Sequence, residues 1–178
     1  KGAKYLNIND KDGICDACKQ NDIKNKIKSF EKFDLKIWEK DILIGLTGSF
    51  LCTKIFGSIM SKQKKGGNII NISSDLGIIA PDQRLYNHTS FSKPVSYSVV
   101  KNGVIGLTKY TASYWGEKNI RCNAIAPGFI ETEMTQALDE NTVKEWRDQI
   151  PLKRGGLPAD IANTSLFLAS DMSAYITG

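Results

Sequence analysis

The stretch Gly67-Asn68-Ile69-Ile70-Asn71-Ile72-Ser73-Ser74 decides the fold, because it has the composition of a buried parallel strand. Residues 68–73 are mostly apolar and rich in β-branched side chains, as strands covered on both faces are. The sequence Lys64-Lys65-Gly66-Gly67 turns the chain into it. Residues 120–126 form a second run of the same kind, which Pro127-Gly128 ends. Two buried strands are therefore predicted.

Helical segments surround these strands. Apolar residues recur at helical spacing over 37–62, where Gly45 and Gly48 predict either a kink or close packing by a neighbour. Helices are also predicted over 95–114, irregularly over 132–149, and over 158–169, where Pro158 suits the first helical position. This alternation predicts an α/β fold with a parallel sheet covered on both faces.

A tyrosine and a lysine at helical spacing carry the predicted chemistry. Tyr97 and Lys101 are four residues apart on the helix that follows Ser74, so they share one helix face. An ammonium beside a phenol favours the phenolate, which can exchange a proton with a carbonyl or an alcohol. Tyr114 and Lys118 have the same spacing. Only the first pair lies between a strand ending in serines and a strand ending in Pro-Gly, so the second pair is interpreted as solvated.

The length, charge and cysteine content of the chain argue against several other functions. At 178 residues the chain is predicted to be one domain, residues 1–178, with a polar surface excursion over 1–37 that includes a short helix near 23–30. The net charge of +5 is interspersed with acids, which does not indicate nucleic-acid binding. No membrane partner is expected. Cys15 and Cys18 lack further clustered metal ligands, so we expect no metal, reduced thiols and a cytoplasmic location.

Taken together, these stretches resemble the short-chain dehydrogenase/reductase family. Residues 67–74 resemble its serine strand, 97–108 (YSVVKNGVIGLT) its catalytic helix, and 123–132 (NAIAPGFIET) its nicotinamide-side motif. Residues 157–178 resemble the segment before its last strand. The resemblance implies a Rossmann-like doubly wound parallel sheet and NAD or NADP as cofactor.

The resemblance also implies roles for individual residues. Ser74, which precedes Asp75-Leu76-Gly77, would be the catalytic serine, Tyr97 the general acid/base, and Lys101 the residue that favours the phenolate and binds the nicotinamide ribose. Ser73 would be a strand-end hydroxyl. The cofactor would be framed by Pro127, Gly128, Ile130 and Thr132, the last contacting its carboxamide or phosphates.

Three departures from the family pattern bear on function. Gly45 stands where the family usually has an asparagine, so the proton relay is supplied otherwise, the rate is low, or the protein is a pseudoenzyme. The glycine-rich dinucleotide fingerprint and the last strand are missing, so we expect a fold incomplete at both ends that binds cofactor poorly alone. The gap between Ser74 and Tyr97 is longer than usual. Its extra residues form either a lid, with Gln83, Arg84 or His88 reaching a polar substrate, or a solvated loop.

These features predict an oxidoreductase that interconverts a secondary alcohol and a ketone. The loop and Gly45 give a narrower resemblance to bacterial flagellin-modification and nonulosonic-sugar oxidoreductases, which implies a sugar substrate. The alternative is a catalytically weak binding or regulatory subunit. The resemblance also implies a homodimer or homotetramer. Gly103 and Gly106 would allow helices to pack closely across its interface, or would face the sheet.

Overall fold

Two parallel strands lie at the centre of the computed structural model, which describes residues 30–86, 92–136 and 140–178. Strand β1 (Gly67–Ile72) pairs with β2 (Ile120–Ile125), with Gly67 opposite Ile120 and Ile72 opposite Ile125. Both strands match the predicted bounds to within a residue. The prediction of a buried strand holds for β2 but not for β1, which is only half-buried and leaves Ile72 49% exposed. Because they are parallel, the segments that leave β1 and β2 emerge at the same edge of the sheet.

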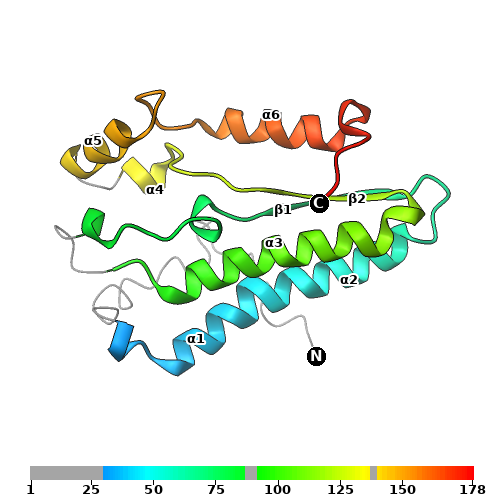
Figure 1. The fold of residues 1–178 in the computed structure, drawn as a ribbon, viewed down its shortest axis with the longest axis horizontal. Coiled ribbons are helices and arrows are strands. Elements are labelled where there is room, and N and C mark those ends of the chain that lie inside the picture. The colour runs from blue at the N-terminus through cyan, green and yellow to red at the C-terminus, as the bar shows by residue number, and fades with distance from the viewer. Residues whose placement is uncertain (1–29, 87–91, 137–139) are drawn as a thin grey trace, which may run out of the picture.

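Helices cover both faces of this sheet (Figure 1). Helices α2 (Gly48–Met60) and α3 (Val95–Trp115) lie on one face, and α6 (Pro158–Ala169) lies on the other. Pro158 occupies the start of α6, where the Asp160 carboxylate accepts a hydrogen bond from Leu157 N at 2.8 Å. The predicted α/β architecture is confirmed.

The predicted helix over 37–62 is a single helical run with a π-helical segment inside it. It comprises α1 (Leu35–Asp41), the π-segment η3 (Ile42–Thr47) and α2. A Cβ atom at Gly45, within η3, would lie 2.5 Å from Val100 Cγ1 of α3, and one at Gly103 would lie 2.9 Å from Leu46 Cδ1. Gly45 and Gly103 therefore permit close helix packing. A Cβ at Gly106 would meet no described atom within 4 Å, so Gly106 does not pack against a neighbouring helix within the described part of this chain, and its packing across a subunit interface stays a prediction.

The segment after β2 is less regular. The predicted irregular helix over 132–149 consists of two separate helices, α4 (Glu133–Gln136) and α5 (Glu140–Gln149). The ring of Phe129 meets that of Trp146 edge-on at 5.3 Å, which packs α5 against the chain leaving β2. The predicted helix near residues 23–30 falls outside the described residues except Phe30, which opens the 3-10 turn η2 (Phe30–Lys32).

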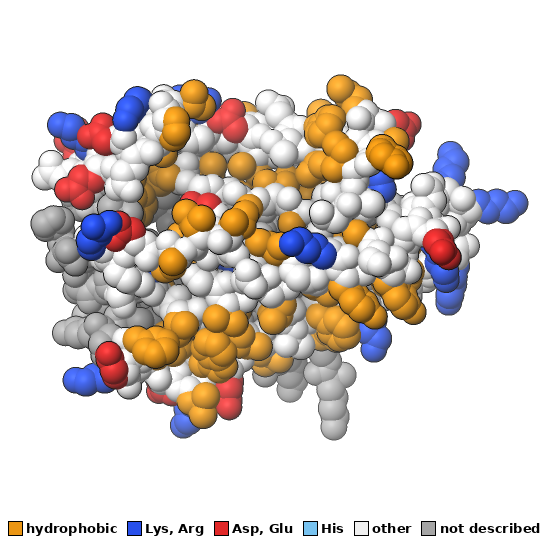
Figure 2. Space-filling view, in the orientation of Figure 1, with side chains coloured by type: hydrophobic (Ala, Val, Ile, Leu, Met, Phe, Trp, Pro, Cys, Tyr) orange, Lys and Arg blue, Asp and Glu red, His pale blue; other side chains and the backbone are white. Residues whose placement is uncertain are grey.

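The α1–α2 run carries a large exposed apolar surface (Figure 2). By length and composition it could cross a membrane, with a mean hydropathy of 1.6, although no membrane partner was expected. In this structure it packs against α3, where a Cβ at Gly57 would lie 2.0 Å from the ring of Trp115. The run is therefore one side of a helix pair, and its other side is exposed through Leu43, Ile44, Phe50, Leu51, Ile55, Phe56 and Ile59.

Candidate active site

Helix α3 places Tyr97 and Lys101 on one face, as predicted. Lys101 Nζ lies 5.7 Å from the centre of the Tyr97 ring. The same ammonium donates a hydrogen bond of 3.0 Å to the carbonyl oxygen of Ile72, the last residue of β1. Partial burial lowers the pKa of Lys101. Lys101 therefore connects the tyrosine to the end of the serine strand.

The two serines after β1 have different environments. Ser73 is buried, and its hydroxyl donates to the carbonyl oxygen of Lys101 at 2.8 Å. Ser74 is also buried, but its hydroxyl stays within its own turn, where it donates to Asp75 Oδ1 at 2.8 Å and accepts from Leu76 N at 3.2 Å. Ser73 thus has the structural role that was expected of a strand-end hydroxyl, and Ser74 is the serine whose hydroxyl is not tied to α3.

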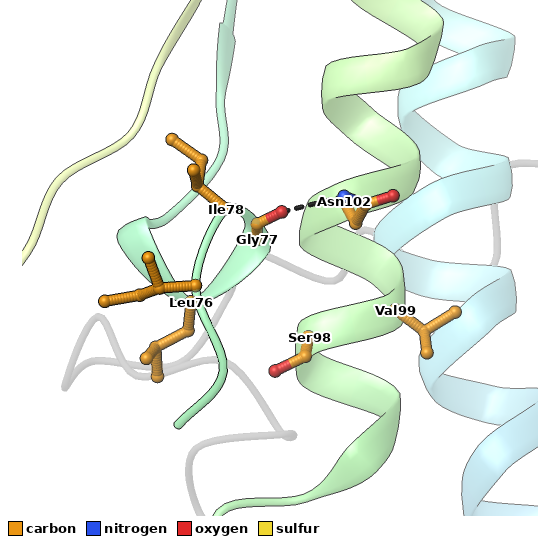
Figure 3. A pocket seen from close by; sticks show the side chains of 7 residues that line it. Leu76, Gly77, Ile78, Ser98, Val99 and Asn102 are labelled. Carbon is orange, nitrogen blue, oxygen red and sulfur yellow. Dashed lines mark hydrogen bonds between the residues drawn. The ribbon is translucent and has the colours of Figure 1, made fainter. Parts of the chain in front are cut away.

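The turn that follows Ser74 is docked onto α3. This 3-10 turn, η4 (Asp75–Gly77), accepts a hydrogen bond of 2.8 Å from Asn102 Nδ2 at the carbonyl oxygen of Gly77 (Figure 3). A Cβ atom at Gly77 would lie 2.7 Å from the backbone of Lys101, so only glycine allows this approach. Ser74 therefore lies beside the helical turn of Lys101, one turn away from Tyr97.

The Pro-Gly segment after β2 lies against the same turn. Asp75 N donates to the carbonyl oxygen of Pro127 at 3.1 Å, and a Cβ at Gly128 would lie 3.3 Å from Asp75 Oδ2. These contacts bring the carboxyl ends of β1 and β2 together, where ligands bind in sheets of this type. Gly128 is itself exposed, so its backbone is open to a ligand at this edge.

The remaining predicted cofactor residues follow along the chain. Ile130 forms a parallel bridge with Gly156, and Thr132 N donates to Thr135 Oγ1 at 2.8 Å as α4 begins. Between them, Glu131 accepts hydrogen bonds from the Arg147 guanidinium at 2.8 and 3.0 Å. This segment is therefore held in place by its own hydrogen bonds. Contacts of Pro127, Gly128, Ile130 and Thr132 with a cofactor stay a prediction.

The long loop between Ser74 and Tyr97 contributes a lysine that the sequence analysis did not single out. The side-chain amide of Gln83, in the 3-10 turn η5 (Gln83–Tyr86), accepts from Lys93 N at 3.0 Å and donates to the carbonyl oxygen of Lys93 at 3.2 Å. Lys93 Nζ lies 4.0 Å from the centre of the Tyr97 ring. Lys93 lies four residues before Tyr97, a spacing at which two side chains on a helix share one face. The sequence places Lys93 in the loop because Pro94 marks the start of the predicted helix.

The residues proposed to reach a substrate from this loop have other partners or are not described. Gln83 holds the backbone of Lys93. The guanidinium of Arg84 donates three hydrogen bonds to the carboxylate of Asp82, and 85% of the Arg84 side chain is exposed. His88 lies outside the described residues. Among the loop residues that the structure describes, Lys93 is the one whose side chain contacts the ring of Tyr97.

A shallow cavity of about 320 Å³ lies beside this site, between η4 and the start of α3 (Figure 3). The hydroxyl of Ser98, which follows Tyr97, points toward the η4 turn and has no hydrogen-bond partner among the described residues. The lining is otherwise mainly apolar, and consists of Leu76, Gly77, Ile78, Ile79, Ser98, Val99 and Asn102.

Other candidates from the sequence lie away from this site or outside the described chain. Tyr114 is 65% exposed and stacks on Tyr110 at 5.8 Å, while α3 ends at Trp115, before Lys118. That second pair is therefore a surface feature, as interpreted. Cys15 and Cys18 are outside the described residues, so the expectation of no metal stays a prediction.

The site and the fold together define a class of protein. A parallel sheet joins a strand-end serine, a tyrosine and lysine on the next helix, and a Pro-Gly segment at one edge. The family model described as "Enoyl-(Acyl carrier protein) reductase" matches residues 21–178. The chain belongs to the short-chain dehydrogenase/reductase family.

Individual relatives agree with this assignment. The chain is 42% identical to the 3-oxoacyl-(acyl-carrier-protein) reductase FabG of Aquifex aeolicus over 85% of its own length and 56% of that protein. It is 38% identical to estradiol 17-beta-dehydrogenase 8 of Callithrix jacchus over 79% of its length and 98% of that sequence. The Aquifex relative is one of several of which the chain spans about half the length.

A solved structure shows the same fold with a cofactor. The 3-oxoacyl-(acyl-carrier-protein) reductase of Brucella melitensis with bound NAD superposes with a TM-score of 0.71 at 27% identity, covering 86% of this chain and 53% of that one. These shares agree with the expected partial Rossmann-like fold. The NAD bound in that structure agrees with the assignment of NAD or NADP as the family cofactor.

Proposed function

We propose that this chain carries, at one edge of its sheet, the catalytic residues of an NAD- or NADP-dependent oxidoreductase that interconverts a secondary alcohol and a ketone. The observation that carries the proposal is the junction of Tyr97, Lys101 and Ser74 where the two strands end. There Lys101 is bonded to the end of β1, and the Ser74 turn is docked on α3. A bound nicotinamide would supply or accept the hydride.

The residues present fit the nicotinamide half of such a cofactor. The exposed backbone of Gly128 and the half-buried side chains of Tyr97 and Lys101 lie at the strand ends, so they offer both an open surface and hydrogen-bonding groups. Pro127 and Gly128 would frame the ring, and Lys101 would hydrogen-bond the ribose. Ile130 and Thr132 continue the same segment.

Each catalytic side chain has a distinct task in ketone reduction. The Tyr97 hydroxyl donates its proton to the carbonyl oxygen as that oxygen gains charge. The Ser74 hydroxyl turns from Asp75 to hydrogen-bond the same oxygen, which holds the carbonyl in place. Lys101 holds a positive charge beside the phenol, so the phenolate left after proton transfer is stabilised.

The relatives' names and the sequence resemblance suggest different substrates. Relatives named 3-oxoacyl-(acyl-carrier-protein) reductase suggest a 3-oxoacyl thioester, whereas the long loop suggests a sugar ketone. We propose to assay the protein with NADH and NADPH on both classes of ketone. Ser74→Ala should lower kcat by at least about a hundredfold. Ser73→Ala, its matched control, should mainly lower stability because Ser73 anchors the strand to α3. Equal losses of kcat in both variants would contradict the assignment.

A second candidate function rests on Gly45. An asparagine there could not fit without moving Val100, because a Cβ would already lie 2.5 Å from its Cγ1. This packing favours the alternative of a catalytically weak binding or regulatory subunit. A Gly45→Asn/Val100→Ala variant makes room for the side chain. If it turns over faster than the natural protein, it supports the alternative, and unchanged turnover argues against it.

We also propose that the protein self-associates through apolar helix surface. The exposed face of α2 carries several large apolar side chains, among them Phe50, Leu51 and Phe56, and such surfaces often mark sites where proteins associate. Light scattering should give the mass of a dimer or tetramer, and a monomer at micromolar concentration would exclude this. A cytoplasmic location is likewise our proposal, which fractionation of cells would test.

A further inference from the structure

The side chain of Lys93 lies beside the catalytic tyrosine, and the backbone of Lys93 is held by the loop that precedes α3. Gln83 holds both backbone polar groups of Lys93, and Pro94 restricts the chain directly after it. The ammonium lies 4.0 Å from the centre of the Tyr97 ring, a distance typical of a cation–π contact. The backbone of Lys93 is therefore already ordered, so a ligand that binds this lysine would not have to order it.

This ammonium is partly desolvated, and within the part of the chain that the structure describes it forms no ion pair. Burial lowers the pKa of Lys93, Asp75 raises it, and Lys101 lowers it. Among the described residues, no carboxylate oxygen lies within 4.0 Å of Lys93 Nζ. Beyond the ring of Tyr97, this partly buried charge has no ion-pair partner among the described residues, so an incoming anion would be stabilised there.

The carboxylate of Asp75 opposes the effect of burial and raises the pKa of Lys93, and two ammonium groups, those of Lys93 and Lys101, lie near this one negative charge. Asp75 Oδ1 accepts hydrogen bonds from the Ser74 hydroxyl at 2.8 Å and from Leu76 N at 2.7 Å. Lys93 and Lys101 therefore give this edge of the sheet an excess of positive charge, which favours an anionic ligand. Because Lys93 lies over the ring of Tyr97, the anion would lie close to the carbon that reacts.

We propose that Lys93 is a specificity residue that binds a carboxylate of the substrate, so that the site selects oxo acids or hydroxy acids over neutral ketones and alcohols. The inference rests on the proposed function, because it places the reacting carbonyl at Tyr97. The ammonium donates a charge-assisted hydrogen bond to the carboxylate, and Tyr97 and Ser74 meet the ketone oxygen of the same molecule.

Binding of two matched ketones tests this directly. The background is the Tyr97→Phe protein with bound NADH or NADPH. It retains the ring face on which Lys93 rests but lacks the hydroxyl that moves the proton. Calorimetry compares acetoacetate, which carries a carboxylate, with its neutral methyl ester. In this background Lys93→Met removes the charge at similar volume, Lys93→Arg keeps it, and Lys109→Met removes an exposed charge elsewhere on α3.

We expect Lys93→Met to weaken acetoacetate binding by about tenfold or more, as the loss of a hydrogen bond to a charged group does. Its effect on the ester should stay below about threefold, and Lys93→Arg and Lys109→Met should stay below about threefold on both ketones. An equal loss for acetoacetate and ester, no loss for either, or no binding of acetoacetate to the background protein would overturn the proposal.

Turnover of the same ketones by the natural protein distinguishes the proposed oxidoreductase activity from the proposed carboxylate site. If neither ketone is reduced but acetoacetate binding depends on Lys93, the proposed activity on these ketones fails and the carboxylate site stands. If both ketones are reduced and Lys93→Met changes the results for both by the same factor, the activity stands and the carboxylate site fails.

Discussion

Replacing Gly45 by asparagine, the residue that the family resemblance implies for this position, should destabilise the protein. The reason is the π-segment η3, which places Gly45 directly against α3. A Cβ there would lie 2.5 Å from Cγ1 of Val100, a buried β-branched residue that is 7% exposed. Because the χ1 angle of valine is strongly restricted in a helix, its side chain cannot easily turn away.

The size of the effect follows from packing and helix propensity. Overpacking a well-filled contact typically costs about 1–3 kcal/mol. Asparagine recovers only about 0.3 kcal/mol relative to glycine through its better helix propensity. Gly45→Asn should therefore lower the free energy of unfolding by about 1–3 kcal/mol. Val100→Ala alone removes two buried carbons and should cost about 1.6 kcal/mol, at about 0.8 kcal/mol for each.

Urea unfolding of the natural protein, both single variants and the double variant tests the argument. The new side chain would occupy space that Val100→Ala vacates, so the double variant should lose less than the sum of the single losses, by about 1 kcal/mol or more. Strict additivity, or a Gly45→Asn protein as stable as the natural one, would show that these helices do not pack as described.

The remaining predictions concern the core thiol, the segment after β2 and the loop. Burial raises the pKa of Cys122 to about 11 from 9.0. The unfolded thiol therefore loses its proton first, and stability should fall as the pH rises between about 9 and 11, by at most about 1.4 kcal/mol per pH unit. Urea midpoints of Cys122→Ala should fall less steeply over that range, and parallel curves would refute the assignment. Glu131→Gln should cost about 1 kcal/mol of stability, since Glu131 accepts from Arg147 and from Gly155 N. The exposed control Glu145→Gln should cost less than about 0.5 kcal/mol in the same urea series, and equal costs would exclude an anchoring role for Glu131. Gln83→Ala should reduce the preference for acetoacetate over its ester by about threefold or more, because Lys93 loses both backbone hydrogen bonds; an unchanged preference in the calorimetric comparison would show that Gln83 does not position Lys93.

The fold and the tyrosine–lysine pair were predictable because each depends on local pattern. Short β-branched runs predicted β1 and β2, and spacing alone placed Tyr97 and Lys101 on one face of α3. The division of roles between Ser73 and Ser74 was also predicted, and their hydrogen bonds are consistent with it. Periodicity and composition carry this kind of information directly.

The other features depend on contacts between distant segments. The π-helical form of η3 arises where Gly45 meets Val100, 55 residues later in the chain, and no local pattern distinguishes it from a kink. The place of Lys93 likewise depends on Gln83, ten residues earlier, holding its backbone.

The rate of hydride transfer in a single turnover tests the central claim most directly. The natural protein, Tyr97→Phe and the matched control Tyr114→Phe would each be mixed, with cofactor bound, with a ketone that the natural protein reduces, while nicotinamide absorbance is followed. Tyr97→Phe should be slower by about a hundredfold or more, with unchanged circular dichroism, and Tyr114→Phe should match the natural protein. A rate for Tyr97→Phe within about threefold of the natural one would show that another group moves the proton.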